Sequence, residues 1–509
     1  MKYKLITGLA VVALLVSAFG FAAIDQSNGG YRYHQHLEQP SEEDLGPCTR
    51  CSGDADLCTH LPIIRIETGG QKIPGKSIHD SEYLTIGYET GDAGETEILV
   101  SVETVEKENS WHHQDDPADI QASALFRIRG NTSRAFSKSN YRLKLVHPDN
   151  TELNNPRRLL GMTRGDEWAL HGPFLDKTLV RNYVCMNLAG EIMGYAPNVR
   201  FCELILDGEY QGVYLLMETI DVQEGRVDLT EYQEGNPFTS YIVSIEPHAD
   251  PERTVENFTQ YTKRIEDYSD LEIRYPSRLA LTPELMEYIN DDFSQIERVL
   301  FSYNISEGNT AYRQLLQVDS FVNYYIFNEF VAINDTFSAS TYFTKDVRGK
   351  LEIGPVWDYN NAWNNYIYPY ESSGFLLSQR GWYAQLMKSE SFVDQVVSRY
   401  KSLRKGILSD EYLEHYILET VDWLGSAVDR NFSVWGYSFD PDQLSILERR
   451  RPISGDTTTT IYDLNPSDFE EALDWMLTYI RYRGDWLDHH IDSLYQYCQT
   501  SKNAPQILR

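Results

Sequence analysis

Two aspartates follow apolar runs, and together they could form one site. Asp335 ends the run VAIND, and Asp358 lies in GPVWDYNN, directly after Trp357. The spacing predicts a helix over VDSFVNYYIFNEFVAIND and a hairpin over TYFTKDVRGKLEIGPVWD, so each carboxylate follows a regular element. Carboxylates at such ends are held in place by rigid structure and project into clefts. One could accept a proton from a hydroxyl group, and the other could ligate Mg²⁺ beside phosphate oxygens.

A predicted antiparallel hairpin carries a row of cations. ALFRIRG and NYRLKLV alternate strictly between apolar and polar residues, and the connecting GNTSRAFSKS is rich in turn residues. Side chains at alternate positions share one face of a strand. On the polar face lie Arg127, Arg129, Arg142 and Lys144. The loop adds Asn131 and Lys138 as donors, so we expect an anion-binding face; the alternative is a solvated sheet face with packed stems.

A third segment, VYLLMETID, places Glu218 on one face of a strand. If that face meets the hairpin, Glu218 can pair with Lys144 and hold its ammonium where phosphate oxygens arrive. The alternative is a surface glutamate at the end of a strand. Cations, a Lys–Glu pair, a base and a metal ligand are together the components of a phosphoryl-transfer site. A sugar hydrolase with Asp335 and Asp358 as its carboxylate pair is the other enzyme class, but the basic face does not suit it.

These residues require a scaffold with two kinds of structure. Strand patterns dominate from residue 61 to about 247, apart from a helical stripe in KTLVRNYVCMNLAGEIMGY that contains Arg181. Helical patterns dominate from about residue 283 to 332 and again from about residue 382 to 497, on either side of the second predicted hairpin. We predict an α+β fold of two lobes, strand-rich in the N-terminal half and helix-rich in the C-terminal half, with the site in the cleft between them.

The composition limits the partners. The chain has 509 residues, a formal net charge of −31 and 41% hydrophobic residues. The hydrophobic content is sufficient for a substantial core. The acidic excess argues against nucleic acid as a partner, because phosphates would be repelled outside a local basic patch.

The N-terminus indicates export. Lys2 and Lys4 precede an apolar stretch over residues 5–23 that ends in small residues. Residues 1–24 therefore are expected to be a cleaved signal peptide or an uncleaved membrane anchor, and the rest a secreted or cell-surface protein. Residues 25–60 are polar and are predicted to be a linker that carries cysteines.

Three cysteines cluster in CTRCSGDADLCTH. Cys48, Cys51 and Cys58, with His60, could hold a tetrahedral zinc ion. A disulfide is the alternative that we favour for an exported chain. A second polar cluster, His112 and His113 beside two aspartates, is expected to be an exposed loop.

Several of these segments occur in the same order in a known family. RIRGNTSR, KSNYRLKL, DKTLVRNYV, LILDGEYQGVYLLMETID, VDSFVNYYIFNEFVAIND and PVWDYNNAW resemble the spore coat protein H (CotH) kinase family. The resemblance covers roughly residues 61–400, and residues 401–509 are expected to be a C-terminal helical region of the same unit. It implies an atypical protein-kinase-like fold that transfers phosphoryl groups from ATP, with Mg²⁺ or Mn²⁺, to Ser or Thr of secreted or spore-coat proteins.

The resemblance also implies roles for individual residues. Asp335 matches the catalytic aspartate, Asp358 the metal-binding aspartate, and Arg181 a recurring arginine expected to orient loops or phosphate. Lys144 with Glu218 is our placement of the nucleotide-binding pair, and Lys138 is the rival lysine.

The chain departs from the family at the metal site. The family has Trp-Asp-x-Asp where this chain has Asn360 in the last position, and Ser340 and Thr341 stand where an Asn is common. Asn360 can still ligate through its amide oxygen, but with one negative charge fewer, which weakens metal binding. A catalytically weak pseudokinase that acts as a surface interaction module is therefore the alternative function.

Overall fold

The computed structural model describes most of the chain: residues 32–51, 57–80, 85–247, 249–259, 269–302, 310–333, 335–365, 371–445, 447–448 and 465–498. The predicted leader, residues 1–24, and the possible anchor, residues 5–23, lie outside these ranges. Among the helices that are described, none has both the length and the apolar character needed to cross a bilayer.

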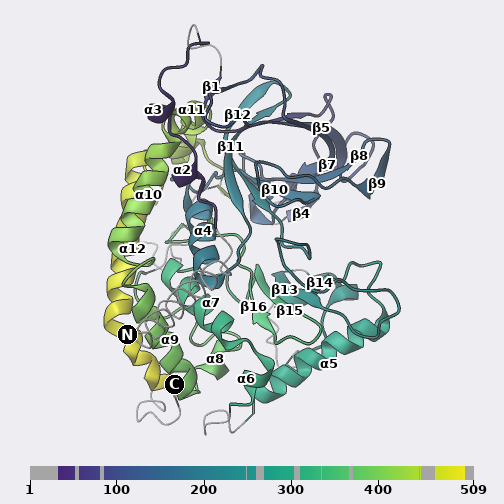
Figure 1. The fold of residues 1–509 in the computed structure, drawn as a ribbon, viewed down its shortest axis with the longest axis vertical. Helices are drawn as coiled ribbons and strands as arrows, with labels where there is room; N and C mark the ends of the chain where they lie inside the picture. The colour runs from purple at the N-terminus through teal and green to yellow at the C-terminus, as the bar shows by residue number, and fades with distance from the viewer. Residues whose placement is uncertain are drawn as a thin grey trace, which may run out of the picture.

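The N-terminal lobe is a large sheet that closes on itself (Figure 1). Its strand order is β10-β12-β11-β2-β5-β7-β8-β9, and β10 also pairs with β8. The strands are β2 (Ile63–Glu67), β5 (Ile98–Val105), β7 (Ile120–Ile128), β8 (Tyr141–His147), β9 (Asn150–Asn154), β10 (Glu167–His171), β11 (Val199–Leu206) and β12 (Glu209–Glu218). Alternate side chains point inward and form one core, in which Phe126, Leu143 and Trp168 are fully buried.

The predicted hairpin of this lobe is confirmed, and the lobe contains a second one. Strands β7 and β8 are antiparallel, with Phe126 opposite Leu143. Strands β11 and β12 are also antiparallel, and they are joined at Asp207 and Gly208, which both have positive φ. That pair of conformations matches the twist of the flanking strands, and Asp-Gly adopts it readily.

Two short ribbons flank the large sheet. One consists of β1 (Cys58–Thr59) and β6 (His112–His113), and the other of β3 (Ser77–His79) and β4 (Thr85–Tyr88).

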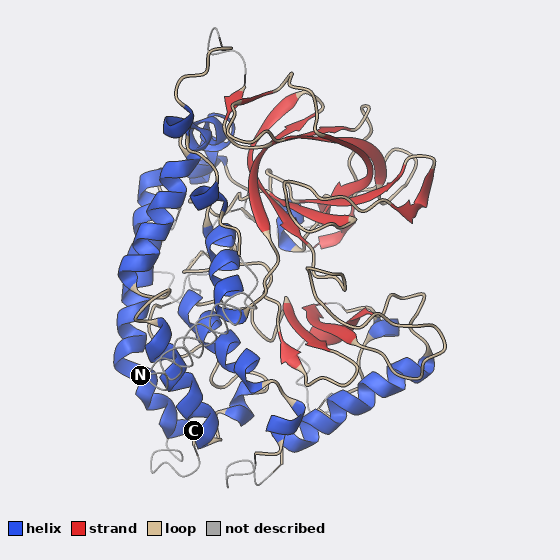
Figure 2. Cartoon of the chain, viewed as in Figure 1, coloured by secondary structure: helices blue, strands red, loops and turns tan. Residues whose placement is uncertain are grey.

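A second, smaller sheet lies below the first (Figure 2). It is antiparallel in the order β14-β13-β15-β16, with β13 (Tyr241–Pro247), β14 (Ser269–Tyr275), β15 (Thr341–Lys345) and β16 (Glu352–Ile353). Helix α5 (Pro283–Leu300) packs on it. The Phe293 ring of α5 lies 5.7 Å from Tyr241 and 6.0 Å from Phe343, centroid to centroid.

Helices form a layer along one side of both sheets (Figure 2). They are α4 (Arg181–Met193), α7 (Val318–Val331), α8 (Tyr383–Leu386), α9 (Glu390–Leu403), α10 (Asp410–Leu424), α11 (Ser426–Trp435) and α12 (Phe469–His490). The short helix α6 (Tyr312–Leu315) lies beside α5 instead. Helix α7 is apolar on nearly all sides and lies at the centre, in contact with α4, α9 and α12. The protein is therefore a mixed α+β fold, strand-rich in the N-terminal half and helical in the C-terminal half, as predicted.

The segment expected to be a linker packs on this body instead. It contains α2 (Gln35–Glu38) and α3 (Glu42–Leu45). The Arg32 guanidinium donates to the Asn187 side chain (3.0 Å) and to the Pro197 carbonyl (2.9 Å). The Trp423 indole donates to the Gln39 carbonyl at 3.1 Å. The polar composition of this segment predicted exposure to solvent, but the segment forms hydrogen bonds with α4, with α10 and with the loop before β11.

Candidate active site

A cavity of about 1580 Å³ is lined by both sheets and by the loops that follow α7 and β16. This volume exceeds the roughly 300–1,000 Å³ of most small-ligand pockets. Five of the predicted site residues line it: Arg129, Asn131, Asp335, Asp358 and Asn360. The two aspartates that follow separate apolar runs therefore do face one cavity.

Asp335 lies in a tight turn just after α7. The helix ends at Ala332, which adopts a left-handed conformation with φ of 54°. The Asp335 carbonyl then accepts the backbone N–H groups of Ser338 and Ala339, both at 2.8 Å. Its carboxylate accepts a bond from the Asn361 amide at 3.2 Å. Partial burial raises the pKa of Asp335, while the Asn361 bond and the charge of Arg380 act in the opposite direction.

Asp358 lies beyond β16, in a backbone conformation unusual for aspartate. Its φ is 65°, in the left-handed region that residues with a side chain seldom adopt. The side chain opens into the cavity, yet the surrounding walls limit its hydration. This desolvation, and then the charge of Asp335, raise the pKa of Asp358 to about 6, and Arg129 partly offsets them.

The side-chain oxygen of Asn360 is a candidate metal ligand. Its amide nitrogen donates to the Asn361 side chain at 3.1 Å, whereas its Oδ1 is buried with no hydrogen-bond partner among the described residues. A buried carbonyl oxygen without a donor is costly unless something binds it. Together with the Asp358 carboxylate, it offers oxygen donors of the kind that Mg²⁺ prefers. The residues present therefore fit a divalent cation.

The loop that carries Asp358 and Asn360 is held in place by α4. At the start of α4, the Arg181 guanidinium donates to the Ala362 carbonyl at 3.0 Å, and the Asn182 side chain accepts the Tyr359 backbone N–H at 2.6 Å. Arg181 is itself buried against Asp176. The bond from Arg181 to the Ala362 carbonyl is consistent with the predicted role of Arg181 in orienting loops. The Arg181 side chain does not line the cavity, so it is not placed to contact phosphate.

A shared contact joins that loop to the turn of Asp335. The Asn328 side-chain oxygen, on α7, accepts the Tyr359 hydroxyl at 2.8 Å. It also lies 3.4 Å from the Thr336 hydroxyl, next to Asp335. Both candidate carboxylates are thus positioned from the same buried amide.

Arginines also line this cavity. The cavity is lined by Arg127, Arg129, Arg134, Arg274 and Arg380. The Arg129 guanidinium lies 5.1 Å from the centre of the Trp357 ring, and no carboxylate of the described residues lies within ion-pair distance of it. Desolvation lowers the pKa of Arg129, while the charge of Asp358 favours its charged form. A cation held by a ring and not by a carboxylate remains available to an anion.

Besides Arg181, four of the predicted nucleotide-binding residues do not line the cavity. Arg142 is neutralised by Glu97 and by Glu167 (2.5 Å), because closure of the sheet brings β10 beside β8. Lys144, on the same strand, lines no part of the cavity. The expected anion-binding face of the hairpin is therefore limited to its end, around Arg129 and Asn131.

The expected pair of Lys144 with Glu218 does not form. Glu218 is fully buried, and its carboxylate accepts the backbone N–H groups of Thr163 (2.8 Å) and Asn198 (3.0 Å) and the Asn198 amide (2.9 Å). In the sheet Glu218 lies opposite Trp168, whereas Lys144 lies opposite Glu167. Neighbouring residues of one strand point to opposite faces, so register separates the two side chains.

The rival lysine, Lys138, is buried away from the cavity. Its ammonium donates to the Val213 carbonyl and to the Asn431 side chain, both at 2.7 Å. It ties β12 to α11, and burial lowers its pKa well below the usual range.

Sequence reasoning missed several cavity residues. His171, at the end of β10, lines the cavity, and desolvation lowers its pKa to about 4. Arg274 and Glu246 come from adjacent strands of the small sheet, and Arg274 pairs with Glu272 at 2.7 Å. Only the alternation in LEIRY could have indicated Arg274, and nothing local marks His171 or Arg380.

Fold and site together define a mixed α+β protein whose two sheets border an acidic and arginine-lined cavity. The family described as CotH kinase protein matches residues 126–487. The chain therefore belongs to the CotH kinase family, which is kinase-like and so implies ATP and a divalent metal in general terms.

Other comparisons add little. No curated protein matches the chain. Among solved structures, the toxin–antitoxin system HipA, HipB and operator DNA complex of Shewanella oneidensis MR-1 is similar at 10% identity and a TM-score of 0.26. The match covers 70% of this chain and 66% of that one, slightly less than two thirds, and at this TM-score it carries no argument.

Proposed function

We propose that this chain is an exported kinase of two-lobed, protein-kinase-like fold. It transfers the γ-phosphoryl group of ATP to Ser or Thr of secreted or surface proteins. The observation that carries the proposal is the unpartnered Asn360 oxygen beside the Asp335 and Asp358 carboxylates. They face a cavity that is also lined by arginines.

In this proposal each residue has one task. Asp358 and Asn360 hold the divalent cation, which neutralises charge on the phosphates. Asp335 accepts the proton of the acceptor hydroxyl, and its raised pKa makes it a better base than an ordinary aspartate. Arg129 and Asn131 contact phosphate oxygens from the end of the hairpin.

The observation that favours a second function is the neutral side chain at Asn360. With one charge fewer at the metal site, the same fold could serve as a secreted or cell-surface interaction module with weak activity. We propose a secreted or cell-surface location because residues 5–23 resemble an export leader. The acceptor proteins are proposed to be in the same location.

The experiment measures nucleotide binding and phosphoryl transfer on the same full-length protein. Mg²⁺-ATP should stabilise it by about 2.7 kcal/mol at a concentration one hundred times the Kd. Labelled ATP should modify the chain itself or dephosphorylated casein as a generic Ser/Thr acceptor. Asp335→Asn should lower transfer by roughly 10²–10⁴-fold and keep the thermal shift.

Asp319→Asn is the matched control, because Asp319 is an exposed aspartate at the other end of α7. It should change neither measurement. Neither shift nor transfer with millimolar Mg²⁺-ATP or Mn²⁺-ATP would reject the kinase in favour of the interaction module. Loss of the shift in Asp335→Asn would instead make Asp335 a metal ligand.

A further inference from the structure

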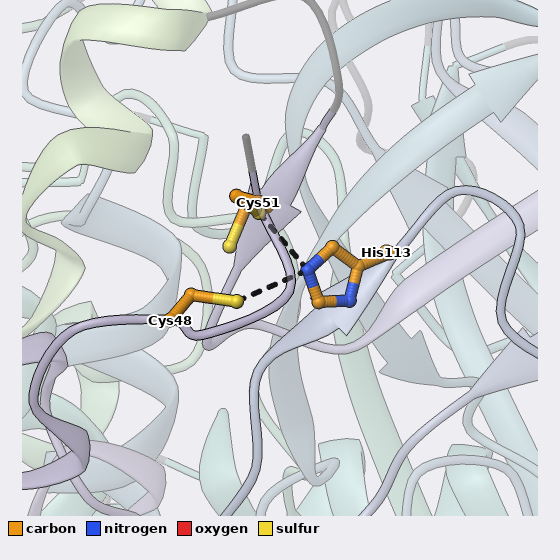
Figure 3. A group of neighbouring side chains, drawn as sticks. Cys48, Cys51 and His113 are labelled. Carbon is orange, nitrogen blue, oxygen red and sulfur yellow. Dashed lines mark hydrogen bonds between the residues drawn. The ribbon is translucent and has the colours of Figure 1, made fainter. Parts of the chain in front are cut away.

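The three N-terminal cysteines lie together with a histidine from a distant part of the chain. The sulfur atoms of Cys48, Cys51 and Cys58 and a ring nitrogen of His113 all lie within 4.8 Å of one another. His113 Nε2 is 3.4 Å from the Cys48 sulfur and 3.1 Å from the Cys51 sulfur (Figure 3). We propose that these four side chains form a tetrahedral zinc site.

The ligand set differs from the one expected from spacing alone. His60 was the expected fourth ligand, but its ring lies 4.9 Å from the Trp423 ring and its Nδ1 lies 3.4 Å from Glu42. His113 takes that place because β1 and β6 pair with Cys58 directly opposite His113. Residues directly opposite in an antiparallel pair project on the same face. The neighbouring His112 points the other way and lies 2.9 Å from the Leu61 carbonyl.

The distances suit zinc better than a disulfide. Zn–S bonds of about 2.3 Å and Zn–N bonds of about 2.0 Å put tetrahedral ligand atoms roughly 3.5–3.8 Å apart, close to the two sulfur–nitrogen distances. None of the three cysteines forms a disulfide in the structure. A disulfide would use two sulfurs and would leave the third, and His113, without a function in the cluster.

The surroundings complete the site as outer-shell groups do in known zinc centres. Asp116 accepts the His113 backbone N–H at 2.9 Å, and its carboxylate lies 3.4 Å from His113 Nδ1. A carboxylate there fixes the tautomer that leaves Nε2 free to ligate. The Arg50 backbone N–H donates to the Cys48 sulfur at 3.4 Å.

Zinc binding at this cluster requires no redox step. Zinc binding displaces one proton from each of three thiols to solvent, and His113 ligates as the neutral ring. Three thiolates and Zn²⁺ leave one negative charge. Arg50 pairs with Asp115 at 2.5 Å and with Asp116, and Lys107 lies 3.8 Å from Asp116, so two cations border the cluster.

Four protein ligands leave no open position, so the site is structural and not catalytic. It fastens the segment around Cys48 and Cys51 to the β1–β6 ribbon. The Trp111 indole, which donates to the Gly46 carbonyl at 2.9 Å, holds the same segment from the other side.

The test measures metal and thiols in the full chain, prepared with zinc under reducing conditions. We expect one zinc per chain by elemental mass spectrometry, and a lower unfolding temperature after chelation. Cobalt added to the zinc-free protein should give visible thiolate-to-metal absorption, a readout that needs no variant to fold.

Matched variants identify the ligands. Cys51→Ser and His113→Ala should lose the zinc, whereas His60→Ala and Cys498→Ser should keep it, because those side chains lie outside the cluster. Titration of the denatured, zinc-free protein should find all six cysteines as thiols. If the titration finds four thiols and the protein binds no metal, the cluster forms a disulfide and the zinc proposal is wrong. Six thiols without zinc or cobalt binding, or zinc loss on His60→Ala, would also overturn it.

Discussion

At the scale of single residues, desolvation and the charge of Asp335 disfavour the ionised form of Asp358. Its φ of 65° is one that Asn adopts more readily than most residues. Its pKa is raised to about 6 by desolvation and by Asp335, whereas an unfolded aspartate titrates near 3.9. Ionisation therefore destabilises the folded metal-free protein above pH 6, and this penalty disappears as the pH falls below about 4.

We therefore predict that Asp358→Asn raises the unfolding temperature of the metal-free protein at pH 7.5 and abolishes stabilisation by Mg²⁺-ATP. The wild type should gain stability relative to the variant between pH 7.5 and pH 4.5. Its Mg²⁺-ATP shift should also shrink as the pH falls through about 6, since a protonated carboxyl is a poor ligand. Thermal unfolding of both proteins across this pH range checks it. If the unfolding temperatures of the two proteins change equally with pH, Asp358 is not desolvated and this prediction is wrong.

At the scale of elements, the contact of Tyr359 with Asn328 couples the metal loop to the turn of Asp335. Tyr359→Phe removes a buried hydroxyl and leaves the Asn328 oxygen only the 3.4 Å contact with Thr336. We expect a loss of about 1–1.5 kcal/mol in the free energy of unfolding, and a weaker Mg²⁺-ATP shift because both carboxylates lose their common support. Denaturant unfolding and the thermal shift measure the two effects.

Tyr400→Phe is the control for that variant. The Tyr400 hydroxyl donates to Asp488 at 2.7 Å, between α9 and α12 and away from the cavity residues. It should lower stability to a similar extent and leave the Mg²⁺-ATP shift unchanged. If both variants weaken the shift equally, general loss of stability and not loop positioning is the cause.

The elements also show how far sequence patterns could predict the site. Apolar runs located the helix before Asp335 and the hairpin before Asp358, and alternation placed Arg129 at the end of a strand. These are local signals. Alternation cannot reveal which strands become neighbours, so the pairing of β8 with β10, which gives Arg142 the carboxylate of Glu167, could not be predicted. The same limit hid His171.

At the scale of the whole molecule, the C-terminal helix α12 packs against the central helix α7. The family match extends to residue 487, and Arg483 of α12 is fully buried against α7. Its guanidinium donates to the Glu329 carbonyl at 2.8 Å and to the Glu329 carboxylate at 2.7 Å. Arg483 therefore neutralises the carboxylate of Glu329 inside the core.

Arg483→Met should therefore lower the free energy of unfolding by about 3–5 kcal/mol, because it leaves the buried Glu329 carboxylate without its cation. Denaturant unfolding provides the measurement. Arg481→Met, two positions away on an exposed face, should change stability by less than about 0.5 kcal/mol. A small effect at Arg483 would mean that Glu329 is protonated in the folded protein.

The packing of the N-terminal segment on α10 has a consequence for the order of folding. Gln39 and Trp423, which share a hydrogen bond, are separated by 384 positions in the chain. At synthesis rates of about 5–20 residues per second, roughly 20–80 s pass between the two residues. One of the first described segments to be synthesised thus completes its packing only when α10 has been made. Until then, its contacts with α10, such as that of the His34 ring with the Tyr416 hydroxyl at 2.6 Å, cannot form.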